Sequence, residues 1–300
     1  MAASSPRIGV VSILSASALF ATIGTAQAIG GLDATPLALG GARLGVASIA
    51  LVLLLPAFGC SRREILGLWR RRATIVAAVA TAFFQVTFFA GLREAGVALG
   101  TLIVIGSVPV FAGLLSWVVL RQRPSLGWLA ATGVCLVGLG LLFSQGLVVG
   151  SLVGVLLCLA TGLGIASYAV AARTLLDEHV HPVSLMAAAF SLGALLMVPL
   201  LAFQPMGWIV QPRGIALALY LGLATMVLAN WLQLQGLSVI GPAPTMTLNL
   251  AEPLIATLLG VLVLGESLSR IAIVGLVLVM AGLGLQSLLV ARRPRGLVRI

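Results

Sequence analysis

Residues 98–120 read ALGTLIVIGSVPVFAGLLSWVVL and contain no charged side chain. A run of about 20 apolar residues can cross a hydrocarbon core of about 30 Å, and comparable runs fill almost the whole chain. With 61% hydrophobic and 8% charged residues in 300, the chain lacks the polar side chains needed to cover a water-soluble globule. Because a backbone in lipid must satisfy its own hydrogen bonds, we expect these runs to be helices. The sequence therefore predicts an all-α membrane protein.

Ten apolar runs are predicted to be transmembrane helices, and turn-forming residues such as Gly241-Pro242 separate them. A transmembrane β-barrel would alternate in polarity at every second residue, and residues 110–120 and 271–280 do not. The predicted helices cover residues 8–29, 36–58, 73–91, 98–120, 126–143, 151–172, 182–203, 214–235, 244–264 and 269–290.

The basic residues predict the orientation of these helices. All 17 positive charges are arginines, and with ten spans most of them fall on one side of the membrane. The positive-inside rule makes that side, with both termini, cytoplasmic. The opposite side receives Arg93, Arg213 and Arg270. The cytoplasmic group is Arg7, Arg62, Arg63, Arg70, Arg71, Arg72, Arg121, Arg123, Arg173, Arg292, Arg293, Arg295 and Arg299.

The net charge of +10 is explained by these arginines beside the membrane, so no nucleic-acid partner is expected. One alternative concerns the first run, because Arg7, an apolar stretch and Ala26-Gln27-Ala28 imitate a secretory signal. Its removal would leave nine spans and an external N-terminus, against the charge pattern. Cys60, Cys135 and Cys158 lack metal-ligand spacing and are expected to be packing residues.

The chain resembles itself at an offset of 144 residues, the distance from Pro109 to Pro253 (253 − 109). The same offset pairs Thr101 with Thr245 and also aligns two Gly-Leu-Gly-Leu runs, at 138–141 and 282–285. We therefore predict two repeats, residues 1–145 and 146–300, of five helices each. Because five is odd, the second repeat enters the membrane inverted. Inverted repeats place a transport site near the bilayer midplane and allow alternating access by rocking of one half.

Two ionisable residues lie well inside the predicted spans, Arg43 and Glu252, and such residues are functional candidates by default. Glu252 shares a helical face with Asn249 and Thr245. The alternative is that Glu252 fixes helix packing, through a hydroxyl or through Arg43.

The residue after Glu252 is Pro253, which removes a backbone donor and can bend the helix. Arg43 is nearer the outer end of its helix. We expect it to be structural, either snorkelling or pairing with Asp33.

Aromatic and amide side chains form a second candidate group, which suits an organic solute with a ring or alkyl part and a polar end. Packing is the alternative for each aromatic residue. Tyr168 and Trp231 are the strongest candidates, because their polar groups need partners in mid-span. The candidate substrate-binding residues are Phe20, Phe84, Gln85, Phe88, Tyr168, Asn230, Trp231, Thr245, Asn249 and Glu252.

No motif for covalent chemistry is apparent. His179 and His181 lack the further ligands of a metal site, and the sequence has no P-loop pattern. An intramembrane enzyme acting on lipids is the alternative from another class, but it needs acid, base or metal ligands clustered at one depth. The sequence offers one mid-span carboxylate, so no enzyme activity, metal or cofactor is expected.

Several motifs resemble the EamA-type repeat of the drug/metabolite transporter superfamily, and the resemblance covers nearly the whole chain. Pro36 with Arg43, and Tyr168 with Arg173, also fit the pattern. The first copy is carried by Phe88-Phe89-Ala90-Gly91-Leu92, Ala98–Pro109 and Gly138-Leu139-Gly140. The second is carried by Asn230-Trp231, Leu250-Ala251-Glu252-Pro253-Leu254, Leu264-Gly265-Glu266 and Ala281-Gly282.

This resemblance implies ten helices in two inverted five-helix repeats, a central cavity and export of small metabolites. The chain is similar to bacterial exporters of aromatic and other neutral amino acids. Proton-driven efflux of lipophilic drugs, with Glu252 as proton carrier, is the nearer alternative. We expect a monomer in a bacterial inner membrane, with a small-molecule substrate and the lipid bilayer as its partners.

Overall fold

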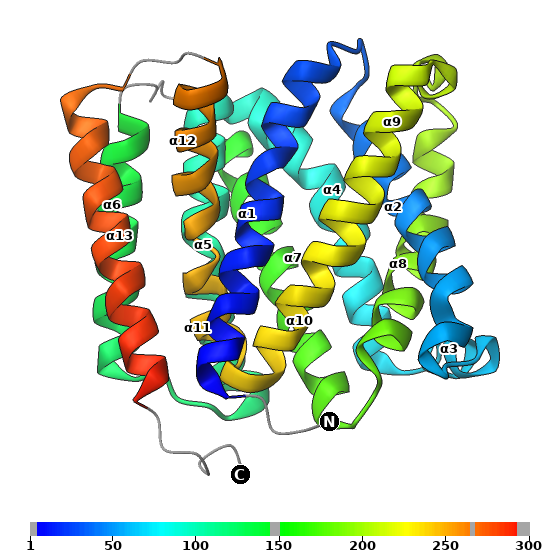
Figure 1. Cartoon of the computed structure of the whole chain (residues 1–300), viewed down its shortest axis with the longest axis horizontal. Coiled ribbons are helices and arrows are strands. Elements are labelled where there is room, and N and C mark those ends of the chain that lie inside the picture. The colour runs from blue at the N-terminus through cyan, green and yellow to red at the C-terminus, as the bar shows by residue number, and fades with distance from the viewer. Residues whose placement is uncertain (1–4, 145–150, 265–267, 293–300) are drawn as a thin grey trace.

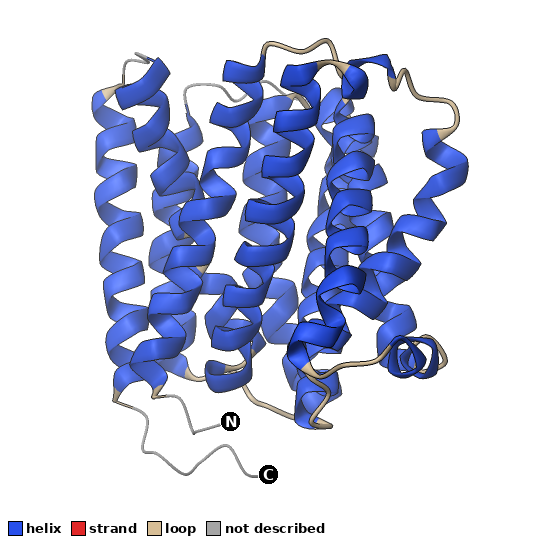
Figure 2. Ribbon diagram, turned by 45° about the vertical axis from the view of Figure 1, so that its right-hand side comes forward, coloured by secondary structure: helices blue, strands red, loops and turns tan. Residues whose placement is uncertain are grey.

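The computed structural model describes residues 5–144, 151–264 and 268–292. Within these ranges ten helices are long and apolar enough to cross a membrane, and Figures 1 and 2 show them as a bundle of roughly parallel rods without strands. The all-α class and the ten spans are confirmed. Gly265-Glu266 and the arginines at 293, 295 and 299 lie outside the described residues.

The observed spans agree with the predicted ones to within a few residues at most ends. Seven spans are single helices: α1 (Pro6–Gly30), α4 (Arg72–Ala95), α5 (Val97–Leu120), α6 (Leu126–Phe143), α7 (Leu152–Asp177), α8 (Pro182–Leu201) and α13 (Arg270–Ala291). The second span is α2 (Pro36–Leu54) followed by the short 3₁₀ helix η1 (Leu55–Phe58).

Two spans contain irregular backbone that the sequence analysis treated as plain helix. The eighth span joins α9 (Pro212–Tyr220), the π-helical segment η4 (Leu221–Leu228) and α10 (Ala229–Ile240). The ninth is divided into α11 (Pro242–Leu248) and α12 (Ala251–Leu264). Two short helices lie outside the spans, α3 (Arg62–Leu68) and η3 (Gly207–Val210).

Serine and threonine side chains fix where many of the helices begin. The hydroxyl groups of Ser125 and Ser269, for example, accept hydrogen bonds from the amides of Trp128 and Ala272. Such N-caps satisfy backbone donors that the helix itself leaves free. The two serines are 144 positions apart (269 − 125), so the same cap starts α6 and α13.

The helix contacts are reciprocal between the two halves. Helix α1 of the first half packs against α10 and α12 of the second, while α7 of the second half packs against α4 and α5 of the first. Matched helices also meet each other directly, α2 with α8 and α6 with α13. Such self-complementary pairing is the signature of a two-fold relation. With five spans in each half, it is the contact pattern of an inverted repeat.

The α6–α13 contact follows this symmetry residue by residue. A Cβ on Gly138 would lie 2.7 Å from the Gly275 carbonyl oxygen, and a Cβ on Gly282 would lie 2.9 Å from the Ala131 carbonyl oxygen. The offset of 144 converts one pair into the other. Because a larger side chain would collide with backbone, these small residues let the two helices pack closely.

The pseudo-two-fold axis passes beside Cys135 and Val279. The Cys135 thiol donates to the Val279 carbonyl oxygen at 3.8 Å, and these residues are themselves 144 positions apart (279 − 135). A residue that touches its own repeat equivalent must lie next to the axis. Cys135 is fully buried there, in the packing role expected of it.

A single glycine connects the third span of each half to the fourth. Gly96 (φ 85°, ψ 149°) joins α4 to α5, and Gly241 (φ 83°, ψ 170°) joins α10 to α11. This backbone region is accessible almost only to glycine. The helices that follow start alike, because the amides of Gly100 and Thr245 donate to the carbonyls of Gly96 and Gly241 at 2.8 and 3.3 Å. Thr245 thus corresponds to Gly100 in space, whereas the ungapped comparison paired it with Thr101.

Helix α3 was not predicted. It lies at the end of the bundle where α1 begins and α13 ends, and Figure 2 shows it nearly end-on, across the direction of the spans. Ile65 and Leu68 are buried beneath it, whereas Leu66 remains exposed. We call this end of the molecule the α3 end.

Candidate functional site

Arg43 of α2 is the cation of the candidate site. Its Nη2 donates to Gln85 Oε1 of α4 at 3.2 Å, and its buried Nε has no hydrogen-bond partner within the described residues. The Glu252 carboxylate of α12 attracts the guanidinium electrostatically. Three ion pairs with nitrogen–oxygen distances within 4.0 Å form in the described part of the chain, and neither Arg43 nor Glu252 takes part in any of them. The pairing with Asp33 that we expected is not among them either.

Gln85, one of the predicted site residues, holds Arg43 in place. It is fully buried, and its Nε2 donates to the Gly40 carbonyl oxygen at 3.1 Å. A Cβ on Gly40 would lie 3.2 Å from three atoms of the Gln85 amide group, so glycine leaves the room that this contact needs. Gly40 and Arg43 lie three residues apart on one face of α2. The amide of Gln85 therefore bridges backbone and side chain of the same helix.

Glu252 begins the first turn of α12, next to a break in the ninth span (Figure 1). At the turn formed by Asn249 and Leu250, the backbone bonds shorten from the helical i−4 pattern to i−3. The Leu250 amide donates to the Thr247 carbonyl at 3.1 Å, and the Glu252 amide donates to the Asn249 carbonyl at 2.9 Å. The regular helix is therefore interrupted at this turn, three residues before Pro253.

Helix α1 reaches this break through Ser17. The fully buried Ser17 hydroxyl donates to the Ile13 carbonyl at 3.0 Å and to Asn249 Oδ1 at 3.4 Å. Asn249 Nδ2 lies 3.9 Å from the Met246 sulfur. Ser17 had no signal in the sequence, because a serine in an apolar helix is equally compatible with bonding only its own backbone.

The π-helical segment η4 closes another side of the site. It packs against α2, and a Cβ on Gly222 would lie 3.3 Å from the Arg43 carbonyl oxygen. The wider π turn brings Asn230 Nδ2 to the Thr225 carbonyl, 3.4 Å away. π-helical turns occur often at functional sites. Asn230, a predicted site residue, is thus engaged with its own irregular span.

Thr245 lies one helical turn before Asn249. Its hydroxyl donates to the Gly241 carbonyl at 2.7 Å, and the residue is fully buried in α11. The Asn249 amide donates to the Thr245 carbonyl at 3.0 Å, in the helical i−4 pattern. Thr245 and Asn249 therefore share a helical face, and Glu252 lies just beyond the turn at Asn249 and Leu250.

The aromatic candidates are divided among different contacts. Tyr168 is buried and stacks on Phe190, with ring centroids 6.1 Å apart, and its hydroxyl has no partner within the described residues. Trp231 is partly buried and packs against the hydrophobic cluster that contains Tyr168 and Phe190. Phe88 packs elsewhere, edge to face with Phe89.

The two remaining aromatic candidates are partly buried. Phe84 packs at the α4–α7 contact, where its Cβ lies 3.3 Å from the position of a Cβ on Gly164. Phe20 follows Ser17 by one turn of α1, on the same helical face.

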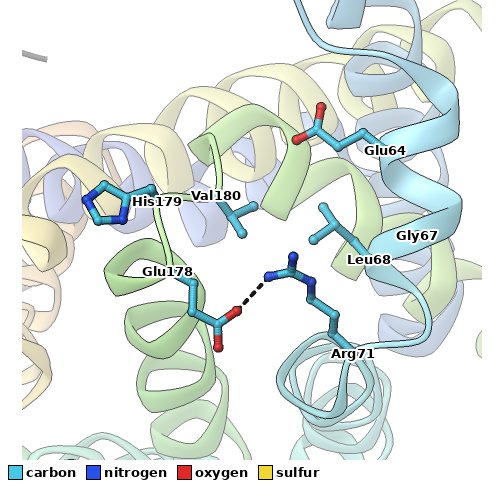
Figure 3. A pocket seen from close by; sticks show the side chains of 7 residues that line it. All are labelled: Glu64, Gly67, Leu68, Arg71, Glu178, His179 and Val180. Atoms are coloured by element: carbon cyan, nitrogen blue, oxygen red, sulfur yellow. Dashed lines mark hydrogen bonds and ion pairs between the residues drawn. The ribbon is translucent and has the colours of Figure 1, made fainter.

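A separate cleft opens at the α3 end, between α3 and the connection from α7 to α8 (Figure 3). Arg71 and Glu178 form an ion pair across it at 2.6 Å, and both side chains are about half exposed. His179 lines the cleft in the left-handed region (φ 62°). His181 caps α8 instead, accepting from the Val183 amide through Nδ1 at 3.3 Å. None of the candidate substrate-binding residues lines this cleft.

Comparison with known proteins identifies the architecture. The model of the EamA-like transporter family matches residues 7–144 and again 152–288, one match in each half. A solved crystal structure superposes with a TM-score of 0.77 at 20% identity, covering 95% of this chain and 98% of that one. The likeness to that structure concerns the fold.

Two relatives carry the name of uncharacterized transporters. YwfM of Bacillus subtilis is 38% identical over 284 residues, which cover 94% of this chain and 93% of that protein. The transporter sll1319 of Synechocystis is 30% identical over 183 residues, 57% of this chain and 53% of its own length.

Proposed function

The chain belongs to the EamA-like transporter family and is a multi-pass membrane transporter, and we propose that it exports neutral amino acids, aromatic ones among them, by alternating access. The observation that carries the proposal is a pair of opposite charges that act on each other across the two repeats without forming an ion pair within 4.0 Å. Arg43 comes from the first repeat and Glu252 from the second, and both residues are partly buried in predicted membrane spans.

Ionisable groups at this depth are costly, by about 3 kcal/mol each on insertion scales. A transporter can offset this cost by using the charges to bind a substrate. A neutral amino acid carries one negative and one positive group, which matches a guanidinium and a carboxylate that attract each other without direct contact. A purely cationic solute would leave one of the two charges without a counterpart, and a purely apolar solute would leave both.

The surroundings of the charges support a small organic solute. Ser17, Gln85 and Asn249 add neutral polar groups near them, and Phe20 follows Ser17 on α1. Apolar side chains with a few convergent polar groups are typical of small-molecule sites. The irregular backbone at Asn249–Leu250 also fits, because interrupted helices line the substrate sites of many transporters built from inverted repeats.

The repeat architecture supports alternating access. The two charged groups of the site come from different halves, so a bound zwitterion contacts both halves. Rocking of one half against the other then exposes the substrate to the opposite side of the membrane. We propose that the halves divide between residues 145 and 146. We also propose that both termini and the α3 end face the cytoplasm of a bacterial inner membrane, as the arginines predict.

Transport into liposomes by the purified protein tests the function. Vesicles loaded with one unlabelled neutral amino acid should take up the labelled form by exchange, and protein-free vesicles should not. A panel of aromatic, aliphatic and charged amino acids with cationic dyes defines the class. Transport of dyes alone, driven by a pH gradient, would support drug efflux. Chemical conversion of the vesicle lipids would support the enzyme alternative.

A further inference from the structure

The guanidinium of Arg43 has far fewer acceptors than donors. Arginine carries five N–H donors, yet its one hydrogen bond in the described part of the chain runs from Nη2 to Gln85. Nε is buried and unpartnered there, and the Glu252 carboxylate does not come within 4.0 Å. A guanidinium with a buried, unpartnered donor favours an anionic ligand that can accept several hydrogen bonds at once.

Gln85 accepts a hydrogen bond from Arg43 but is not itself an anion. Gln85 is neutral, and its Nε2 is used on the Gly40 carbonyl at 3.1 Å, so its Oε1 is turned toward Arg43. The Gln85 oxygen thus accepts one N–H of Arg43 Nη2, and the other N–H donors of the guanidinium are left for another acceptor. Arg173 provides the contrast, because its guanidinium bonds Asp177 and the carbonyls of Leu237 and Ser238 at 2.6–3.0 Å.

We propose that Arg43 is the carboxylate-binding group of the transport site and that Gln85, seated on Gly40, positions it. The inference rests on the proposed function and assigns the two ends of the substrate. The carboxylate of the solute lies on Nε and the free Nη atoms of Arg43, and its ammonium group faces Glu252. The preferred ligand class is a small organic acid with a cationic group close to the carboxylate.

This assignment predicts which analogues bind. Replacing the carboxylate of a transported amino acid by a carboxamide removes a charge-assisted, bidentate contact with Arg43. We expect that analogue to compete roughly 10- to 100-fold more weakly, since a hydrogen bond to a charged group contributes about 1.5–3 kcal/mol. Acetylation of the amino group keeps the carboxylate and removes the charge that faces Glu252.

The test combines analogues with variants of the purified protein in liposomes, measured as inhibition of exchange and as ligand-induced shifts of thermal unfolding. The compounds are a neutral amino acid, its carboxamide, its N-acetyl derivative and an aromatic carboxylate without an amino group. In wild type the acid should compete best. In Arg43→Lys, which cannot form the bidentate contact, the acid should lose most of its advantage over the carboxamide. The discrimination against the N-acetyl derivative should persist.

Gln85→Glu keeps the proposal testable if Arg43 variants fail to fold. It places a carboxylate beside Arg43, so the variant should remain folded while the free acid binds at least about tenfold more weakly. Arg93→Gln is the matched control. Arg93 is largely exposed and forms a 3.7 Å surface pair with Glu94. Its replacement should therefore leave the preference for the free acid over the carboxamide unchanged.

Two results would overturn the assignment. One is a carboxamide that competes as well as the acid in wild type, and the other is full acid preference in both Arg43→Lys and Gln85→Glu. If amino acids are carried under these conditions, the proposed function survives this failure. If no amino acid is carried but the simple carboxylate binds through Arg43, the proposed function fails and the assignment holds. Absence of any carboxylate binding rejects both.

Discussion

The fourth span of each repeat contains a matched proline, and the two spans differ in what happens around it. Helix α5 runs without interruption from Val97 to Leu120 with Pro109 inside. Its counterpart stops at Leu248 and resumes at Ala251, just before Pro253. Pro109 removes a hydrogen bond inside α5, whereas Pro253 lies in the first turn of α12, where the backbone amide has no partner within that helix. The comparison shows that proline by itself does not decide whether the span breaks.

Polar contacts from other helices distinguish the broken span. Thr247 Oγ1 accepts from Trp128 Nε1 of α6 at 2.9 Å and lies 2.8 Å from the Thr132 hydroxyl. Asn249 is held by Ser17 of α1. The matching stretch of α5, residues 102–105, reads Leu-Ile-Val-Ile and offers no such groups. Ser107, near Pro109, bonds only the Val104 carbonyl of its own helix, at 3.0 Å.

The difference also concerns the proposed function. The broken span carries Glu252 where α5 has Val108 (252 − 108 = 144). In the proposed site Glu252 binds the substrate together with Arg43, whereas the matched position in α5 offers only an apolar side chain. Each prediction below perturbs one side of this comparison.

The largest effect is expected from Glu252. Glu252→Gln should lower exchange in liposomes by at least about tenfold, because the ammonium group of the substrate loses its charged partner. The matched Val108→Thr should leave exchange nearly unchanged. Equal loss in both variants would mean that the two spans do not differ in function.

The same Glu252 variant separates proton coupling from binding. If Glu252 carries protons without contacting the substrate, uptake driven by a pH gradient should disappear in Glu252→Gln while exchange at equal pH survives. Preserved exchange at equal pH would therefore contradict the substrate contact proposed above and favour the drug-efflux alternative. Thermal unfolding of the variant serves as the folding control.

The next largest effect is expected from Thr247. Thr247→Val preserves the shape of the side chain but leaves Trp128 Nε1 and the Thr132 hydroxyl buried without their partner. An unsatisfied buried group costs about 1–3 kcal/mol, so thermal unfolding in detergent should shift clearly downward. Ser107→Ala in α5 removes only an intrahelical bond and should be close to neutral.

A smaller loss is expected from Ser17. Ser17→Ala removes the link between α1 and Asn249 and should cost about 1 kcal/mol. Hydrogen exchange of the Leu250 and Glu252 amides should accelerate, since the turn loses a support. Unchanged exchange at both amides would show that α1 does not hold the break.

The smallest effect is expected from Pro253, the proline next to Glu252. In Pro253→Ala the break should persist, because Thr247 and Asn249 keep their partners. Stability should change by about 1 kcal/mol or less, the range of a single hydrogen bond. A strong rise in protection of amides 250–253 would mean that the helix has become continuous and that proline alone caused the break.

Much of the candidate site follows from the sequence, because polar residues inside apolar spans are few. Gln85, Asn249 and Glu252 are identified by their depth alone, and the structure brings them near Arg43 or Ser17. Arg43 satisfies the same depth criterion. The pairing with Asp33 expected for Arg43 is not among the ion pairs of the described residues. Its hydrogen-bond partner Gln85 lies 42 positions away in the chain (85 − 43), whereas Asp33 is a near neighbour.

What the sequence by itself determined is the set of spans and their repetition. Apolar run length is a local property fixed by the thickness of the bilayer, and the recurrence at 144 positions is a property of the residue string. Even the α6–α13 contact, with Gly138 and Gly282 exchanged by the repeat, follows the pattern visible in the sequence.

Only the tertiary structure decided where the backbone departs from regular helix and which charges meet. The break at Asn249–Leu250 and the π turns of η4 depend on groups supplied by α1, α2 and α6, which local sequence does not encode. In an apolar bundle, a polar group takes the nearest partner that packing offers. The positions of Arg43 and Glu252 relative to each other are therefore set by the packing of two inverted repeats against one another.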